Sequence, residues 1–255
     1  MLKTNRKDLI KLFRKLGVKK GDTVLIHTST LSLGKLEGGL NTLHQSLLSL
    51  LSNQGNIIVP TFTYSFRRKK IFDINKSNCC KSMGIYPEYF RNLKDAVRSA
   101  DPLFSMCCIG PDANELMRRE SNCSFGKNSV FEKIVKKNAL IIGLGITYTI
   151  GFPIFMYLEK KGKVDYRIDK KFFGYSINKK KRKFKDSIIH FARNEKRFPE
   201  LIIDREKVGK ILEKKKICKN LKFKYGRAIS FRTLNFEKEN LKLLKKNPNV
   251  FVEKK

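Results

Sequence analysis

Short apolar segments alternate along this chain with segments whose apolar residues recur at helical spacing. Residues 139–145 read Ala-Leu-Ile-Ile-Gly-Leu-Gly, and residues 23–27 and 56–60 are similar short runs. Such runs are typical of strands that are buried on both faces of a sheet. Residues 4–17 and 40–51 have the periodicity of amphipathic helices. The alternation predicts an α/β layered core.

The rest of the chain continues this pattern and then changes character. We expect a further strand at 103–109, a strand and turn at 223–233, and a hairpin around 179–183. We expect helices at 87–93, 112–119, 130–136, 149–160, 206–214 and 235–246. No linker rich in Gly, Pro or Ser separates two parts. We therefore expect one domain, residues 1–255, in which residues 161–255 form a basic C-terminal α+β elaboration.

The formal net charge of +33 is uneven, because residues 160–255 hold 32 basic and 11 acidic side chains. A basic surface attracts polyanions such as nucleic acids and phosphorylated metabolites. Most of these charges are scattered lysines, and the sequence contains neither a recognisable nucleic-acid motif nor an aromatic–basic stacking pattern. We therefore interpret the charge as a solvated surface and expect no specific nucleic-acid partner.

Three further features concern compartment and metals. No apolar run approaches the roughly 18 residues that a membrane span needs, and the N-terminus lacks the apolar core of a signal peptide. We therefore expect a cytoplasmic protein. The six cysteines include the adjacent pairs Cys79-Cys80 and Cys107-Cys108. Structural zinc sites need two to four residues between ligands, so we expect reduced cysteines and no metal.

A loop rich in hydroxyl groups and glycine follows the strand at 23–27 and precedes the helix at 40–51. Such a loop offers backbone N–H groups, hydroxyls and the positive end of a helix dipole, which suit a phosphate or pyrophosphate. It is not a P-loop, because the Gly-Lys-Ser/Thr ending is absent. An ordinary polar helix cap is the alternative interpretation. The residues of the loop that we select as candidates for cofactor binding are His27, Thr28, Ser29, Thr30, Leu31, Ser32, Gly34 and Gly38.

This loop and several later motifs resemble the aminoglycoside 3-N-acetyltransferase family. His27-Thr28-Ser29-Thr30-Leu31-Ser32-Leu33-Gly34 followed by Glu37-Gly38-Gly39 is similar to the opening motif of that family. The other landmarks, in the family's order, are Pro60-Thr61-Phe62-Thr63, Phe72-Asp73, Met83-Gly84, Phe90-Arg91, Arg98-Ser99 with Pro102 and Ser105, Gly110-Pro111, Phe125-Gly126 with Ser129, and Tyr225-Gly226-Arg227-Ala228. Each motif is short, but their joint order extends over nearly the whole chain.

The resemblance implies a three-layer α/β/α sandwich with a central mixed sheet. It also implies transfer of an acetyl group from acetyl-CoA, the co-substrate, to an amine of a sugar. Some members of the family are thought to acylate sugar nucleotides, and the segments at 164–167 and 190–193 look more like those members. We therefore expect an N-acyltransferase whose loop at 27–39 holds the CoA and whose acceptor is an amino sugar or a sugar nucleotide. The sequence leaves open whether the chain forms a homo-oligomer.

Two departures affect the expected catalytic residues. The family has His-x-x-Glu on the helix after the glycine-rich strand, where this chain has Met156 and Glu159, and Asp101 stands where resistance enzymes have histidine. Methionine cannot accept a proton from an ammonium group. The remaining candidates for a catalytic base are Glu159, Asp101 and His190, although Glu159 could be an ordinary helix charge and Asp101 could cap a turn. The alternative functions are an inactive acyltransferase-like binding protein and, less favoured, a basic nucleic-acid-binding protein.

Overall fold

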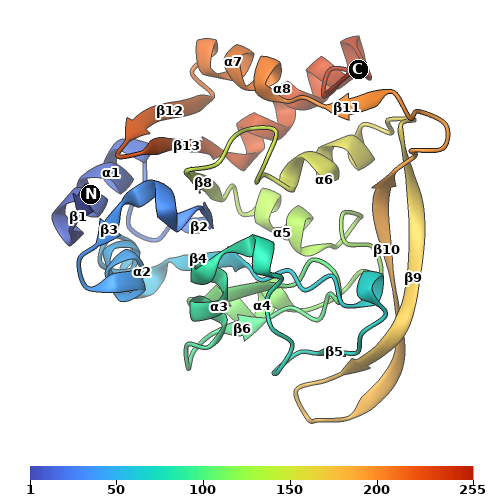
Figure 1. Ribbon diagram of the computed structural model, residues 1–255, viewed down its shortest axis with the longest axis horizontal. Coiled ribbons are helices and arrows are strands. Elements are labelled where there is room, and N and C mark those ends of the chain that lie inside the picture. Colours follow the sequence, from blue (N-terminus) through green and yellow to red (C-terminus); the bar gives the residue numbers. More distant parts are fainter. Residues whose placement is uncertain (255) are drawn as a thin grey trace.

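The computed structural model describes residues 1–254 and is built around a seven-stranded mixed sheet (Figure 1). Strand β2 lies between β8 and β4 and is parallel to both, whereas the other neighbouring pairs are antiparallel. In spatial order the strands are β12 (Cys218–Phe223), β13 (Gly226–Arg232), β8 (Leu140–Leu144), β2 (Thr23–Thr28), β4 (Asn56–Pro60), β7 (Met106–Ile109) and β6 (Val97–Arg98). The apolar runs at 23–27, 56–60 and 139–145 are therefore the three parallel strands.

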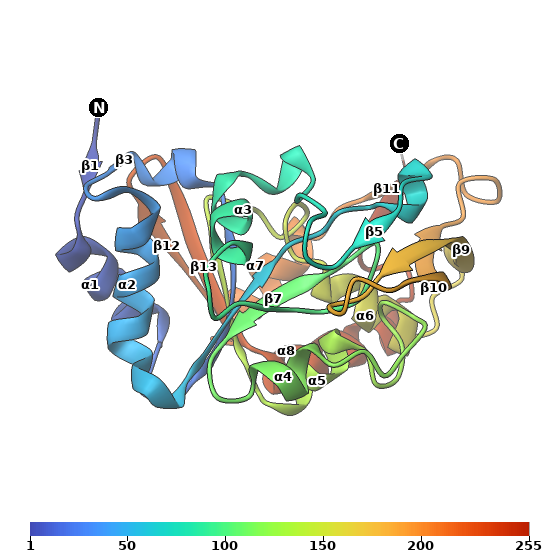
Figure 2. The same cartoon turned by 90° about the horizontal axis from the view of Figure 1, so that it is seen from below.

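Helices cover both faces of this sheet, as Figure 2 shows from below. Val24 and Ile26 belong to one apolar cluster, and Leu25 between them belongs to the other, because successive side chains of a strand point to opposite faces. The first cluster includes α1 (Arg6–Leu16), α2 (Gly39–Leu51) and α3 (Ile85–Arg91). The second includes α4 (Ala113–Met117), α5 (Val130–Lys136), α6 (Ile154–Lys161), α7 (Glu206–Lys214) and α8 (Thr233–Lys246). The predicted α/β fold with a central mixed sheet is confirmed.

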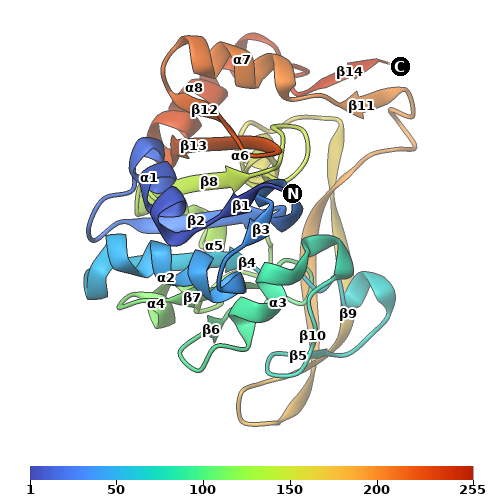
Figure 3. The ribbon, with the colours of Figure 1, turned by 60° about the vertical axis from the view of Figure 1, so that its left-hand side comes forward.

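A long hairpin extends along one side of the molecule (Figure 3). It consists of β9 (Arg167–Ile177) and β10 (Lys183–Arg193), at the position that the sequence indicated, and β5 (Phe72–Asp73) lies parallel to β9. Two small sheets complete the fold: β1 (Lys3–Thr4) with β3 (Lys35–Leu36), and β11 (Leu201–Ile203) with β14 (Val252–Lys254). The C-terminal region also supplies β12 and β13 to the central sheet.

Two expected elements begin later than the sequence suggested. Strand β7 begins at Met106 because the Asp101 carboxylate accepts hydrogen bonds from the backbone N–H groups of Leu103 and Phe104. Helix α6 begins at Ile154 because a turn precedes it, in which Gly151 has a φ of 114°. Within residues 1–254, no helix is both long and apolar enough to cross a membrane.

Candidate functional site

The loop after β2 is seated on the ends of β8 and β13. The Ser29 N–H donates to the carbonyl oxygen of Leu144 at 2.7 Å, and the Tyr225 N–H donates to the carbonyl oxygen of Ser32 at 3.0 Å. A Cβ atom on Gly145 would collide with the Ser32 hydroxyl, so this approach requires glycine. The loop at 27–39 is therefore fixed at the edge where the parallel strands β2 and β8 end, and at this edge α/β folds commonly bind ligands.

The loop presents polar groups and one exposed apolar side chain. Its 3-10 helix η1 (Thr30–Leu33) carries Leu31, which is 88% exposed. Helix α2 then begins after Gly38, which has a φ of 79° and makes no side-chain cap. Because no side chain caps this helix end, its first N–H groups are free to bind an anion. Of the candidate residues from Thr28 to Gly38, Leu31 and Gly38 are exposed and the others are part-buried.

His27 lies beneath this surface and is buried, at 6% exposure. Its ring packs edge-on against Phe152, with 5.6 Å between the ring centroids. Burial lowers the pKa of His27 to about 3, so the ring is neutral at pH 7. This environment favours a packing role for His27 over direct contact with a cofactor.

Glu159 lies in a buried ion-pair network and is 0% exposed. Its Oε2 atom is 2.8 Å from Nε of Arg167 and 3.1 Å from Nη2 of Arg205. The Tyr166 hydroxyl donates to Oε1 at 3.2 Å. These partners satisfy both carboxylate oxygens and compensate the buried charge. The geometry favours a structural role for Glu159 and does not support the role of catalytic base that the sequence suggested.

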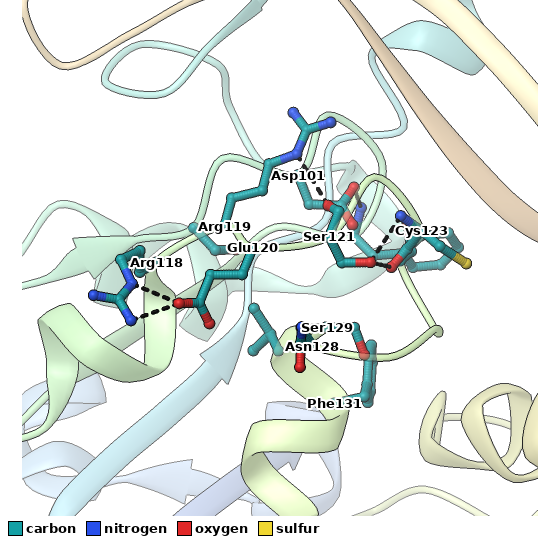
Figure 4. Close-up of a pocket in the computed structure, with 13 residues that line it drawn as sticks. Asp101, Arg118, Arg119, Glu120, Ser121, Cys123, Asn128, Ser129 and Phe131 are labelled. Carbon is teal, nitrogen blue, oxygen red and sulfur yellow. Dashed lines mark hydrogen bonds and ion pairs between the residues drawn. The ribbon is translucent and has the colours of Figure 1, made fainter.

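Asp101 caps a turn, which is the alternative that the sequence left open. Its Oδ1 atom accepts from the N–H groups of Leu103 and Phe104, both at 2.8 Å, and burial raises its pKa. Asp101 borders a small cavity in which Arg118 and Glu120 form an ion pair (Figure 4). The volume of about 20 Å³ has room for little more than one water molecule. This cavity is too small for a sugar, so Asp101 is not positioned in an acceptor pocket.

His190 retains a ring nitrogen without a partner. It lies on β10, with its ring centroid 4.9 Å from that of Phe104 and 6.0 Å from that of Phe125. Among residues 1–254, Nδ1 has no hydrogen-bond partner although it is buried. Burial, followed by the positive charges of Arg167, Arg67 and Lys170, lowers the pKa of His190 to about 4.

The structure brings some of the candidates together and separates others. Asp101 and His190 both contact Phe104. Arg167 links Glu159 to β10, the strand that carries His190. It forms an ion pair with Glu159, and its Nη1 donates to the carbonyl oxygen of Phe191 on β10 at 3.1 Å. No hydrogen bond or ion pair of residues 1–254 joins Glu159, Asp101 and His27 to one another. Met156 is half-buried against the apolar core.

A basic groove that the sequence did not predict lies beside the loop. The groove and the loop meet at Gly84, which lines the groove. A Cβ atom on Gly84 would lie 3.7 Å from the carbonyl oxygen of Thr28 in the loop. The groove has a volume of about 920 Å³. Its lining residues are Ser65, Arg68, Lys70, Lys76, Ser77, Asn78, Cys79, Cys80, Lys81, Gly84, Ile85, Glu88, Tyr89 and Asn92. The basic residues are visible in the sequence, but only the fold places them around one hollow.

The groove has a net positive charge because its one carboxylate is neutralised. Nε of Arg91 donates to Oε2 of Glu88 at 2.9 Å, and the Cys79 N–H donates to the same oxygen at 2.8 Å. Burial raises the pKa of Glu88, but these hydrogen bonds outweigh burial and lower the pKa to about 2. The four cationic side chains of the lining are therefore balanced by no free carboxylate within it. Among residues 1–254, no group of three or more His, Cys, Asp or Glu side chains is placed to hold a metal ion.

The fold is that of the aminoglycoside acetyltransferases. The structure superposes on aminoglycoside acetyltransferase AAC(3)-IVa with a TM-score of 0.80 at 20% identity, covering 98% of this chain and 92% of that one. It superposes on AAC-IIIb, whose structure is a binary complex with CoASH, with a TM-score of 0.81 at 15% identity, covering 96% and 97% of the two chains.

Sequence comparison assigns the family. The model of the aminoglycoside 3-N-acetyltransferase family matches residues 25–244, and this chain belongs to that family. The chain is 24% identical over 154 residues to a protein of Bacillus subtilis, the SPbeta prophage-derived aminoglycoside N(3')-acetyltransferase-like protein YokD. That match covers 52% of this chain and 57% of YokD, so the chain spans little more than half the length of the curated relative it matches.

Proposed function

We propose that this chain is an acyl-CoA-dependent N-acyltransferase whose acceptor is an amino sugar that carries negative charge, such as a sugar nucleotide. Membership of the family supports acetyl transfer. The loop at 27–39, with the uncapped start of α2, supplies N–H groups and hydroxyls for the pantetheine and pyrophosphate of CoA. The backbone N–H of Thr30 stabilises the negative charge that develops on the thioester oxygen, whereas that of Ser29 is already donated to Leu144.

The charge of the groove is the observation that carries the choice of acceptor. Arg68, Lys70, Lys76 and Lys81 line it, and Glu88 is neutralised by Arg91. An aminoglycoside carries several ammonium groups, which this groove repels, whereas the phosphates of a sugar nucleotide are attracted to it. A volume of about 920 Å³ also lies within the usual range for a ligand site, which is roughly 300–1,000 Å³.

The acyl transfer itself requires a neutral amine. The amine nitrogen attacks the thioester carbonyl carbon, the carbon–sulfur bond breaks, and the sulfur leaves with the proton that the amine loses. Of the three candidate bases, His190 keeps a ring nitrogen without a partner, but this nitrogen is buried and His190 does not line the basic groove, so we assign it no role in orienting the amine. Because its pKa is about 4, His190 is a weak base, and the acceptor must reach the site unprotonated.

A second candidate function is binding without catalysis. Met156 replaces the histidine of the family, and the carboxylate of Glu159 is fully occupied by Arg167, Arg205 and Tyr166. A chain in this state retains the CoA loop and the basic groove. It binds CoA and an anionic sugar but releases no thiol.

A thiol-release assay with acetyl-CoA distinguishes the two candidates. The panel contains sugar nucleotides with a free amine, neutral amino sugars and aminoglycosides, and mass spectrometry identifies the acylated product. The enzyme hypothesis predicts turnover with the anionic acceptors and little with aminoglycosides. Calorimetry that detects CoA binding while every acceptor fails supports the binding protein, and failure to bind CoA contradicts both candidates.

A further inference from the structure

The face of the β9–β10 hairpin that points away from the molecule carries aromatic and basic side chains together. Phe173 is 70% exposed and Tyr175 is 43% exposed. Nζ of Lys171 lies 5.0 Å from the centroid of the Phe173 ring, and Nζ of Lys183 lies 4.7 Å from that of the Tyr175 ring. No aromatic–basic stacking pattern is apparent in the sequence, but the folded hairpin brings these side chains together.

The alternation of the strand determines this arrangement. A Cβ atom on Gly174 would lie 2.7 Å from the Phe66 ring, and Ser176 is buried, so these residues face the body of the protein. Phe173 and Tyr175 therefore face away from it. Ser187 is paired with Phe173 and Lys185 with Tyr175. We call the residues Lys171, Phe173, Tyr175, Lys183 and Lys185 the outer ribbon face.

The outer ribbon face has no free negative charge. The two acidic residues of β9 and β10 are both paired with cations of the body: Asp169 with Lys160 at 2.6 Å and Asp186 with Arg119 at 2.8 Å. The turn between the strands adds the exposed residues 179–182, which read Lys-Lys-Lys-Arg. This concentration of positive charge repels a second copy of the chain and attracts an anionic polymer.

The position of the two lysines decides which polymer fits best. Each ammonium group lies over an aromatic ring, so when the lysine turns to a phosphate, the ring face beside it becomes a surface on which a base can stack. Stacking of a base on such a ring is sequence-tolerant and is worth about 1–3 kcal/mol. Insertion of the same rings into a membrane would carry the ammonium groups with them into the apolar region, which is unfavourable.

We infer that the outer ribbon face binds single-stranded nucleic acid without sequence preference. Phe173 and Tyr175 stack on successive bases, and the lysines of the face and of the turn contact the phosphates. The loop at 27–39 and the basic groove contribute no residue to this face, so the inference is independent of the proposed acyl transfer.

Fluorescence anisotropy with a labelled 15-nucleotide oligo(dT) tests the inference on the intact protein. We expect binding that weakens steeply with salt. The double variant Phe173→Ser, Tyr175→Ser should lose at least about tenfold in affinity for oligo(dT), since two stacking contacts are removed. The control variant Ile211→Ser, Leu234→Ser removes exposed apolar side chains from α7 and α8 and should bind like the wild type.

An oligomer with the same number of phosphates but without bases separates stacking from charge. It should bind more weakly than oligo(dT) and should not discriminate between the wild type and the Phe173→Ser, Tyr175→Ser variant. Equal binding of both oligomers by both proteins would overturn the inference. Tighter binding to vesicles with anionic lipids or to an acidic polysaccharide than to oligo(dT) would also overturn it.

Discussion

Glu159 is a buried carboxylate held between two arginines, and its removal tests whether the network is structural. In Glu159→Ala, Arg167 and Arg205 stay buried without a compensating charge, so the free energy of unfolding should fall by about 3–5 kcal/mol. Urea denaturation measures this loss. Asp169→Ala, which breaks the half-exposed pair with Lys160, should cost less than about 1 kcal/mol.

The variant Glu159→Gln distinguishes structure from catalysis. It retains an acceptor for the Tyr166 hydroxyl but loses the charge that faces the arginines. We expect any loss of activity to follow the loss of folded protein. A Glu159→Gln protein with wild-type stability and no activity would show that Glu159 is the base after all.

His27 provides a prediction for pH. Its pKa is about 3 in the folded protein, whereas an unfolded histidine titrates near 6.5. The unfolded chain therefore binds more protons between these values, and the stability that His27 contributes is present above pH 6.5 and is lost as the pH falls toward 3. From pH 7 to pH 5 the wild type should lose about 2 kcal/mol more than His27→Gln. Equal losses in urea titrations of the two proteins would contradict the assigned burial.

Met156 is the position at which a base can be restored. Its side chain is half-buried, so an imidazole can replace it without leaving a large cavity in the core. If the chain is a slow enzyme, Met156→His should raise kcat, because a general base contributes about 10²–10⁴-fold. Met156→Leu is the matched control and should leave kcat unchanged. A Met156→His protein that binds CoA but gains no activity would favour the binding function.

At the scale of elements, the loop at 27–39 connects the central sheet to the proposed cofactor. Leu31 is exposed and lies within the loop, so Leu31→Asp should leave the fold intact and place a negative charge beside the CoA phosphates. We expect CoA affinity to fall by about tenfold or more, since a like charge costs at least about 1.4 kcal/mol. Isothermal titration calorimetry measures the change, with Leu234→Asp on α8 as the control.

Gly38 is a poorer choice for this test. Its φ of 79° is strained for other residues, and a Cβ atom there would lie 2.5 Å from the Thr42 hydroxyl. A bulky residue at Gly38 would therefore disturb the start of α2 as well as CoA binding. Unchanged CoA affinity in Leu31→Asp would contradict the assignment of the loop.

The elements differ in how far the sequence predicted them. The parallel strands β2, β4 and β8 were predictable because residues buried on both faces form continuous apolar runs. The late start of β7 was not, because it depends on hydrogen bonds that the Asp101 carboxylate accepts from backbone N–H groups. The hydroxyl and glycine residues between a strand and a helix predicted the loop. The environment of Glu159 was not predictable, because it depends on Arg205, which is 46 residues away in the chain.

At the scale of the whole molecule, the net charge of +33 has local consequences that composition cannot show. Lysines that look scattered along the sequence surround the groove at Arg68–Lys81 and cover the outer ribbon face. Both surfaces arise where the fold gathers these cations and leaves few unpaired carboxylates beside them. Folding therefore divides one compositional feature into two surfaces with different expected ligands.

The acceptor specificity of the groove tests the central claim most directly. The measurement is the ratio of kcat/KM for a sugar nucleotide with a free amine to kcat/KM for an aminoglycoside, in the wild type and in Lys76→Glu, Lys81→Glu. The control Lys94→Glu, Lys127→Glu changes the net charge equally at exposed positions outside the groove. We predict a ratio well above one in the wild type and the control, and a fall of at least about tenfold in the groove variant, because phosphate contacts are replaced by repulsion. A wild type that prefers the aminoglycoside, or a ratio that the groove substitutions leave unchanged, would contradict the account.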